Sequence, residues 1–243
     1  MQENTYDDNA FFEKYSQMPR SVHGLEAAGE WHALQPLLPP LEGKRVLDLG
    51  CGFGWHCRYA VDHGAASVVG VDLSEKMLAE ARAGTFSPKI RYVRSSIETF
   101  AYEPEAYDLV LSSLALHYVF PFAEICRKVR RSLADGGRFV FSVEHPVFTA
   151  QGPQAWHCGE DGTPLHWPVD DYFGQGPREA VFLGETVRKY HRTLTGYVTA
   201  LLDAGFRLTA LVEPEPDPAL LVTVPGMRDE LRRPMMLILA GDV

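Results

Sequence analysis

The sequence predicts an α/β fold in which helices cover both faces of a mostly parallel sheet, the arrangement known as doubly wound. Three observations predict this class. Short apolar runs alternate with helical patterns between residues 45 and 143, and this alternation is typical of parallel strands joined by helices. The apolar runs are nearly continuous, as in strands that are buried on both faces. The first run ends in a glycine-rich turn, at the edge where open α/β sheets bind ligands.

Local signals place each element along the chain. Strands are expected at residues 45–49, 67–72, 90–93, 108–111, 138–143, 206–212 and 235–240. Helices are expected at residues 26–38, 55–63, 74–83, 122–133 and 187–202. Pro39-Pro40 ends the first helix, Ser74 is placed to cap the third, and Asp135-Gly136-Gly137 supplies a glycine stop after the fourth.

The segment after the fifth strand has a different composition. Residues 147–184 are rich in Gly, Pro, Trp and His and carry a turn signal at Glu160-Asp161-Gly162. Loops longer than about 15 residues are usually functional lids or disordered, and four aromatic side chains argue against disorder: Trp156, Trp167, Tyr172 and Phe173. We expect an insertion whose rings stack on a planar ligand or form a satellite core. It interrupts a core of residues 41–146 and 185–243, and residues 1–40 form a helical lid.

Composition limits the kinds of protein that this chain can be. Its 243 residues, 46% hydrophobic and 23% charged, suit one domain with a sizeable core and an insertion. The chain has 23 basic against 32 acidic residues, a net charge of -9, and no cluster of Lys and Arg. Because a protein that binds a phosphate backbone usually carries a basic face, we expect no nucleic-acid partner.

Other sequence features bear on the cellular location. Residues 1–20 lack the apolar core of a signal peptide, and the aliphatic stretch at residues 235–240 is far too short to cross a bilayer. The four cysteines lack the paired short spacings of a zinc site, and we expect no metal. The expectation is a cytoplasmic protein with reduced thiols and no membrane contact, as a monomer or a homodimer.

The glycine-rich turn at residues 48–54 is the main functional signal, although a tight structural turn or a dinucleotide fingerprint can look similar. Trp55 stands where the dinucleotide pattern needs a small residue, and Asp48 stands where a pyrophosphate would be repelled. S-adenosylmethionine has no phosphates, and its cationic amino group suits a carboxylate. Roughly 20 residues further on, Asp72 ends the second strand, the position of an acid that accepts from ribose hydroxyls.

Four segments in the correct order resemble the class I S-adenosylmethionine-dependent methyltransferase family. They are the first motif, the ribose-binding strand end, the fourth strand with its loop, and the turn into the fifth strand, at residues 46–54, 69–74, 107–118 and 133–139. The resemblance implies a seven-stranded sheet with S-adenosylmethionine as the cofactor. Residues 11–15 resemble the lid of small-molecule members, in which Tyr15 and Arg20 close over the cofactor; a plain surface helix is the alternative. The Asn-Pro-Pro-aromatic motif of amino-methylating nucleic-acid enzymes is absent after the fourth strand.

The resemblance also implies which residues bind the cofactor. The set is Tyr15, Arg20, Asp48, Gly50, Cys51, Gly52, Gly54, Asp72, Leu73, Met77, Ser96, Ile97 and Ser113. In this set, Asp48 reaches the methionine amino group and Asp72 holds the ribose. Leu73 and Met77 lie against the adenine, and Ser96 stands where the family often has an acid.

Methyl transfer from a sulfonium needs alignment of donor and acceptor and exclusion of water. A general base is needed only where the acceptor keeps a proton. The candidate catalytic residues follow the fourth and fifth strands: His117, Glu144 and His145. His117 can instead bond a backbone carbonyl, and the other two can be structural strand-end residues. His191 is a further candidate, with an exposed helix face as the alternative.

These observations lead to one main hypothesis, methyl transfer from S-adenosylmethionine to a small-molecule acceptor capped by the insertion. Two alternatives stay open. One is a nicotinamide-dependent oxidoreductase, which Trp55 and Asp48 disfavour. The other is a cofactor-binding protein without transferase activity, which is compatible with the sequence because no single catalytic residue is obligatory for methyl transfer.

Overall fold

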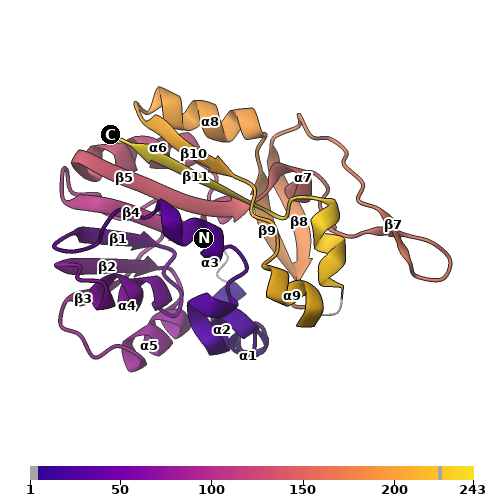
Figure 1. Cartoon of the computed structure of the whole chain (residues 1–243), viewed down its shortest axis with the longest axis horizontal. Helices are drawn as coiled ribbons and strands as arrows, with labels where there is room; N and C mark the ends of the chain where they lie inside the picture. The colour runs from indigo at the N-terminus through magenta and orange to yellow at the C-terminus, as the bar shows by residue number, and fades with distance from the viewer. Residues whose placement is uncertain (1–4, 224–225) are drawn as a thin grey trace.

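The computed structural model describes residues 5–223 and 226–243. Its centre is a seven-stranded sheet in the order β10-β11-β5-β4-β1-β2-β3 (Figure 1). β11 runs antiparallel to both of its neighbours, and the other pairs are parallel. The strands are β1 (Arg45–Leu49), β2 (Ser67–Asp72), β3 (Ile90–Arg94), β4 (Tyr107–Ser113), β5 (Leu133–Glu144), β10 (Arg207–Val212) and β11 (Met236–Asp242). The predicted doubly wound, mostly parallel sheet is confirmed.

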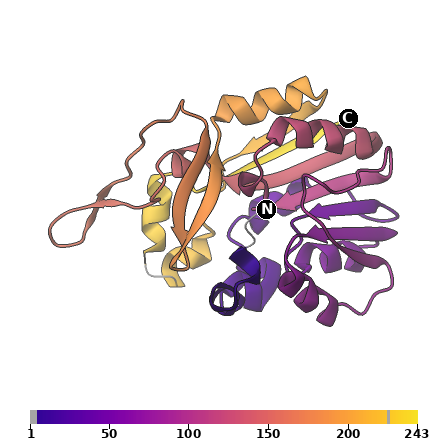
Figure 2. The same ribbon diagram turned by 180° about the vertical axis from the view of Figure 1, so that it is seen from behind.

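Helices cover both faces of this sheet (Figures 1 and 2). On one face lie α4 (Trp55–Asp62) and α5 (Glu75–Ala83), and on the other lie α6 (Phe122–Ser132) and α8 (Leu194–Asp203). Successive residues of a strand point to opposite faces. Leu47 and Leu49 of β1 therefore pack with α6 and α8, whereas Val46 packs with α4 and α5. The sheet thus separates two apolar cores.

Polar side chains fix where several helices begin. Ser74 Oγ accepts a hydrogen bond from Met77 N at 3.1 Å, which confirms the predicted cap of α5. Thr193 caps α8 in the same way, and Asp8 caps α1 (Asn9–Ser16). Each cap satisfies an amide group that has no partner within its own helix.

The N-terminal segment is a series of short helices near the carboxyl ends of the strands (Figure 1). After α1 come α2 (Pro19–His23), a 3-10 turn (Gly24–Ala27), α3 (Trp31–Leu34) and a second 3-10 turn (Gln35–Leu37). The single helix predicted at residues 26–38 is therefore wrong. Pro36, in the second turn, lacks the amide hydrogen that a continuing helix needs.

A long hairpin begins within the insertion and is formed by β8 (Gly176–Phe182) and β9 (Glu185–His191). The helix predicted from residue 187 is wrong as far as residue 193, because α8 begins only at Leu194. Leu183 and Gly184 form a two-residue turn with φ of 54° and 83°, the backbone geometry that favours a tight hairpin. The inserted region thus continues beyond its expected end at residue 184.

The insertion also contains a second, smaller hairpin. β6 (His157–Cys158) pairs with β7 (Pro164–His166), and the predicted turn at residues 160–162 lies between them. This hairpin projects from the body of the molecule (Figure 1). The remaining elements are short: η1 (Thr5–Asp7), η4 (Leu116–Tyr118), α7 (Pro146–Thr149), α9 (Pro218–Thr223) and η5 (Met227–Arg232).

Two negative findings apply to residues 5–223 and 226–243. No helix there is long and apolar enough to cross a membrane. No group of three or more His, Cys, Asp or Glu side chains there is placed to hold a metal ion.

Candidate active site

A cavity of about 1090 Å³ lies at the carboxyl ends of the parallel strands. We call its two parts the glycine-loop end, next to residues 50–53, and the hairpin end, next to β8 and β9. Most of the predicted cofactor residues line the cavity: Tyr15, Arg20, Gly50, Cys51, Gly52, Asp72, Leu73, Met77, Ser96, Ile97 and Ser113. Of the candidate catalytic residues, His117 and Glu144 line it as well.

Close contacts that only glycine permits shape the glycine-loop end. Gly50 has a φ of 76°, and a Cβ at this position would lie 2.3 Å from Ala115 Cβ. Gly54 has a φ of 74°, and a Cβ there would lie 2.2 Å from Tyr92 Oη. Side chains other than glycine rarely adopt such φ values. Gly54 lies behind the cavity wall at the start of α4, which corrects the expectation that it contacts the cofactor.

Backbone amides anchor Asp72 at the end of β2. Its Oδ2 accepts a hydrogen bond from Gly52 N and its Oδ1 one from Ser74 N, both at 2.9 Å. Burial raises the pKa of Asp72 above its ordinary value despite these bonds. Each carboxylate oxygen retains a lone pair, and the side chain lines the cavity. Asp72 is therefore placed to accept hydrogen bonds from ribose hydroxyls.

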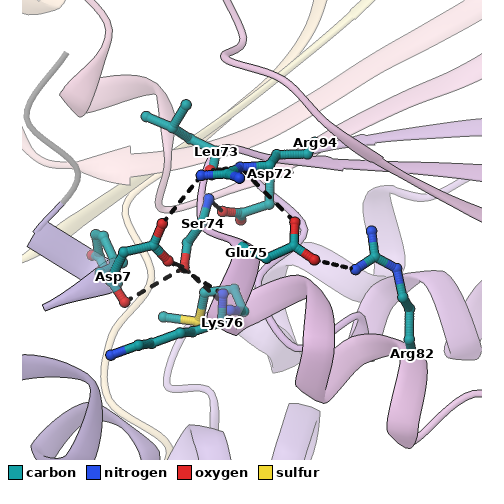
Figure 3. Close-up of polar contacts among 10 residues, drawn as sticks. Asp7, Asp72, Leu73, Ser74, Glu75, Lys76, Arg82 and Arg94 are labelled. Atoms are coloured by element: carbon teal, nitrogen blue, oxygen red, sulfur yellow. Dashed lines mark hydrogen bonds and ion pairs between the residues drawn. The ribbon is translucent and has the colours of Figure 1, made fainter. Parts of the chain in front are cut away.

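The segment around Asp7 is fastened beside Asp72 (Figure 3). Asp7 Oδ1 accepts hydrogen bonds from Ser74 Oγ at 2.5 Å and from Lys76 N at 3.2 Å. Its Oδ2 lies 3.6 Å from Arg94 Nη2. Burial raises the pKa of Asp7, but these partners lower it more and leave it below its ordinary value. The ionised carboxylate thus ties the N-terminal helices to the strand end that carries Asp72.

Asp48 takes a different position from the one predicted. Its side chain is 1% exposed and lies outside the cavity wall, where Oδ2 accepts a hydrogen bond from Cys57 Sγ of α4 at 3.3 Å. Burial raises the pKa of Asp48 to about 7. Oδ2 thus faces α4, whereas Oδ1 is buried and has no hydrogen-bond partner among the described residues.

Glu30 is a cavity residue that the sequence did not reveal. It is 1% exposed, and its Oε1 accepts from Ser113 Oγ at 2.7 Å and lies 3.3 Å from Arg20 Nη2. Burial raises the pKa of Glu30, but Arg20 and Ser113 leave it below its ordinary value. Within the described part of the chain, Glu30 Oε2 and Trp55 Nε1 have no hydrogen-bond partner. Because such buried groups are costly, a ligand that bonds them is favoured.

At the hairpin end, Glu144 lies in a closed ring of hydrogen bonds. Its Oε1 accepts from Lys189 Nζ at 2.6 Å, and its Oε2 from Gln154 Nε2 at 2.7 Å. Gln154 Oε1 accepts a second bond from Lys189 Nζ at 2.9 Å. The Lys189 and Glu144 side chains are 3% and 16% exposed, so this ion pair is largely removed from solvent. Neither Lys189 nor Gln154 was predicted as a site residue.

The loop after β4 faces this ion pair. His117 Nδ1 accepts a hydrogen bond from the Glu144 backbone N–H at 3.4 Å, and burial lowers the pKa of His117 to about 4. Tyr6 Oη donates to Tyr118 Oη at 3.3 Å. Arg192 holds the loop in place by donating to the carbonyl oxygens of Leu116, Val119 and Phe120. Apolar side chains complete the wall: Phe148, Phe182 and Val187.

The two other histidines have structural positions. His145 Nδ1 accepts from Val147 N at 3.0 Å and caps α7, while its Nε2 lies 2.8 Å from Glu213 Oε1. This placement behind the cavity wall corrects the expectation that His145 is catalytic. His191 is buried in β9 rather than exposed on a helix. Its two ring nitrogens lie 2.8 Å from Thr149 Oγ1 and from Tyr172 O.

The aromatic rings of the insertion form a cluster behind the cavity. Trp167 stacks on Phe148 with ring centroids 5.0 Å apart, and Trp156 meets Trp167 edge-on at 5.3 Å. The Arg233 guanidinium lies 4.2 Å from the Trp167 ring centroid. Phe173 is 89% exposed. Among the described residues, none of the four predicted rings lines the cavity, which favours the satellite core over stacking on a ligand there.

Comparisons with known proteins agree with this site. Residues 47–141 match the methyltransferase domain family. A crystal structure from Listeria monocytogenes, assigned to the S-adenosylmethionine-dependent methyltransferases, is 56% identical over 90% of this chain and 98% of its own, with a TM-score of 0.86. A second such structure, from Mesorhizobium loti, is 43% identical over 90% of this chain and all of its own, with a TM-score of 0.84.

The chain therefore belongs to the class I S-adenosylmethionine-dependent methyltransferases, and S-adenosylmethionine is its cofactor. This membership decides against the nicotinamide-dependent alternative. A protein of Haemophilus influenzae without an assigned function is 31% identical over 99% of this chain and 97% of its own.

Other relatives match only about half of the chain. A malonyl-[acyl-carrier protein] O-methyltransferase of Enterobacter lignolyticus is 36% identical over 52% of this chain and 49% of its own length. A tRNA U34 carboxymethyltransferase of Pseudoalteromonas translucida is 33% identical over 51% of this chain and 41% of its own. The chain thus spans less than half the length of these two relatives, which act on different kinds of acceptor.

Proposed function

We propose that this methyltransferase acts on a small-molecule acceptor, bound at the hairpin end of the cavity next to the cofactor. One observation carries the proposal: the glycine-loop end and the hairpin end are parts of one cavity of about 1090 Å³. Pockets of roughly 300–1,000 Å³ hold a drug-sized ligand. A cavity slightly above this range suits the cofactor together with a small acceptor.

The residues at the glycine-loop end fit S-adenosylmethionine, which supplies a methyl group already activated by the sulfonium. Asp72 would accept from the ribose hydroxyls, and Leu73 and Met77 would lie against the adenine. Glu30 would hold the cationic amino group, because it lines the cavity and its Oε2 is buried and unpartnered among the described residues. Asp48 Oδ1 is also unpartnered there, but Asp48 does not line the cavity.

The N-terminal helices would act as the lid of the cofactor pocket. Tyr15 and Arg20 line the cavity from α1 and α2, and Arg20 would pair with the cofactor carboxylate. Asp7 fastens this segment next to Asp72. Covering the cavity excludes water, which a transfer that depends on alignment requires.

A small acceptor is favoured over a nucleic acid by charge and by the lining of the cavity. The net charge of -9 disfavours binding to a phosphate backbone. β8 and β9 line the acceptor side of the cavity with Phe182, Val187 and Lys189.

A labelling experiment tests this proposal. The protein is incubated with S-adenosylmethionine carrying an isotopic methyl label and, separately, with a metabolite extract, total RNA or total protein. We expect label in organic products of the metabolite arm. Label found only in RNA or in protein would contradict the proposal, while leaving the assignment to the methyltransferases intact.

A further inference from the structure

Three residues near Glu144 bring hydrogen-bond donors to the hairpin end of the cavity. They are the His117 ring, the Tyr118 hydroxyl and the Lys189 ammonium, and all three residues line the cavity. Their surroundings determine which protons and lone pairs each of them can offer to a bound molecule. What they offer indicates the chemical class of the acceptor.

His117 is a donor at this site. Its Nδ1 accepts the Glu144 backbone N–H, and only an unprotonated ring nitrogen can accept. In the neutral ring the proton then lies on Nε2. Because burial lowers the pKa of His117 to about 4, the ring is neutral near pH 7. It therefore has an N–H for an acceptor molecule and no free lone pair with which to remove a proton.

Glu144 is also a weak base, because its ion pair with Lys189 and the hydrogen bond from Gln154 stabilise the ionised carboxylate. Oε1 accepts from Lys189 Nζ and Oε2 from Gln154 Nε2. Burial raises the pKa of Glu144, but His117, Lys189 and these hydrogen bonds leave it below its ordinary value. The Lys189 ammonium has three protons, of which Glu144 and Gln154 take two. The third remains for a ligand.

Tyr118 supplies the third donor. Its oxygen accepts the proton of the Tyr6 hydroxyl at 3.3 Å, which leaves the O–H of Tyr118 itself to donate. Burial raises the pKa of Tyr118, so the phenol keeps its proton at neutral pH. The hairpin end thus combines three donors with the apolar side chains of Phe148, Phe182 and Val187.

We propose that the acceptor is a small apolar molecule that ends in a carboxylate, and that a carboxylate oxygen receives the methyl group to give a methyl ester. This inference rests on the proposed function. The carboxylate oxygen forms the new C–O bond while the methyl–sulfur bond of the sulfonium breaks, and the electron pair stays on sulfur. An anion and a sulfonium become a neutral ester and a thioether, and no proton moves.

The chemistry of other acceptors fits this end of the cavity less well. Alcohols and phenols keep their proton at neutral pH and need a general base. Alkylamines are protonated at neutral pH, have no lone pair in that form and must also lose a proton to a base before they accept a methyl group. Carboxylic acids, with ordinary pKa values near ~4, are already ionised, and their oxygens accept from N–H and O–H groups. Donors without a base therefore favour a carboxylate.

A matched substrate series tests the inference. Phenylalkanoic and straight-chain alkanoic acids are compared with the corresponding alcohols, amides and amines, and methylated products are identified by mass spectrometry. We expect methyl esters from members of the acid series, with the other series unreactive. Methylation of an alcohol or an amine instead would overturn the inference and leave the proposed function standing. Failure of every acid in a protein that binds S-adenosylmethionine would also overturn it.

A conservative variant adds a readout for the donors. Tyr118→Phe removes one hydroxyl that donates to the carboxylate, a loss that corresponds to about tenfold or more in affinity. We expect KM for the acid to rise by that factor and the Kd of S-adenosylmethionine to stay unchanged. The control is Tyr107→Phe, a buried tyrosine near the opposite end of β4. Equal KM values for the two variants would contradict the assigned role of Tyr118.

Discussion

The two ends of the cavity are built in different ways. The glycine-loop end comes from successive strand–turn–helix units, so Gly50, Gly52 and Asp72 are each set by a local motif. The hairpin end joins Tyr6, His117 and Lys189, which are far apart in the sequence and meet only in the folded chain. Local motifs thus build the glycine-loop end, whereas tertiary structure builds the hairpin end.

The two ends also depend on different forces. At the glycine-loop end, backbone amides hold Asp72 although burial disfavours its charged form. A buried ion pair holds the hairpin end, where Lys189 and Glu144 satisfy each other. Removal of one partner of a buried pair leaves the other uncompensated. Substitutions at the glycine-loop end should therefore weaken cofactor binding, and substitutions at the hairpin end should lower the stability of the fold.

The largest effect is expected for Lys189→Met, which leaves Glu144 buried without its cation. We expect a loss of about 3–5 kcal/mol in the free energy of unfolding, measured by urea denaturation. The double variant Lys189→Met, Glu144→Gln removes both charges and should recover most of that loss. If the single and the double variant are equally destabilised, the ion pair does not hold this end together.

The next effect separates two carboxylates of the glycine-loop end. Asp72→Ala removes charge-assisted hydrogen bonds of about 1.5–3 kcal/mol, so S-adenosylmethionine should bind about ten- to a hundredfold more weakly by titration calorimetry. Asp48→Asn, the matched variant outside the cavity, should leave that affinity within about twofold. A larger loss of affinity from Asp48→Asn than from Asp72→Ala would support the contact between Asp48 and the methionine amino group that the sequence predicts.

The pH dependence of the free energy of unfolding tests the position of Asp48. Burial raises its pKa from 3.8 in the unfolded chain to about 7 in the folded one, so the folded state binds more protons between these values. The stability that this difference contributes is complete below pH 3.8 and is lost as the pH rises through 7. Asp48→Asn avoids that loss, and its stability relative to the wild type should increase by about 1–2 kcal/mol across neutral pH.

Urea denaturation below and above pH 7 measures this difference. Asp135, which is exposed, is replaced by Asn as the control for the effect of the substitution itself. A flat difference for Asp48→Asn would mean that the carboxylate is ionised in the folded state, as it would be in contact with a cation.

The smallest effect concerns the insertion. Trp156 lies in the ring cluster behind the cavity, and Phe182 lies in the cavity wall. Trp156→Leu should leave both the Kd of S-adenosylmethionine and the KM of the acceptor within about twofold, whereas Phe182→Ala should raise the acceptor KM several-fold through lost apolar contact. Steady-state kinetics with any accepted substrate gives both values. A selective rise in KM for Trp156→Leu would indicate that the ring cluster is part of the acceptor site.

The sequence predicted the parts of this molecule that depend on local patterns. The seven strands, the cap at Ser74 and the place of Asp72 at the end of β2 follow from periodicity and turn chemistry. The helix predicted at residues 187–202 includes Val187 and Lys189 of β9, although α8 starts only at Leu194. The Leu183-Gly184 turn was the available signal for the hairpin.

One physical reason explains why the sequence did not predict the positions of several site residues. Glu30 is one acid among many in the sequence, and only its burial beside Arg20 and Ser113 marks it as part of the site. The position of His145 directly after β5 predicts a residue at the entrance of the cavity, yet its side chain points toward Glu213. Side-chain direction after the end of a strand is set by tertiary packing, which no local pattern encodes.

A crystal structure of the complex with S-adenosylhomocysteine tests the central claim, that one cavity holds the cofactor and its acceptor side by side. We predict ribose hydroxyls within hydrogen-bond distance of Asp72, the amino group on Glu30 Oε2, and the sulfur facing His117 and Lys189. An amino group on Asp48, or a sulfur that faces away from the hairpin end, would contradict the account.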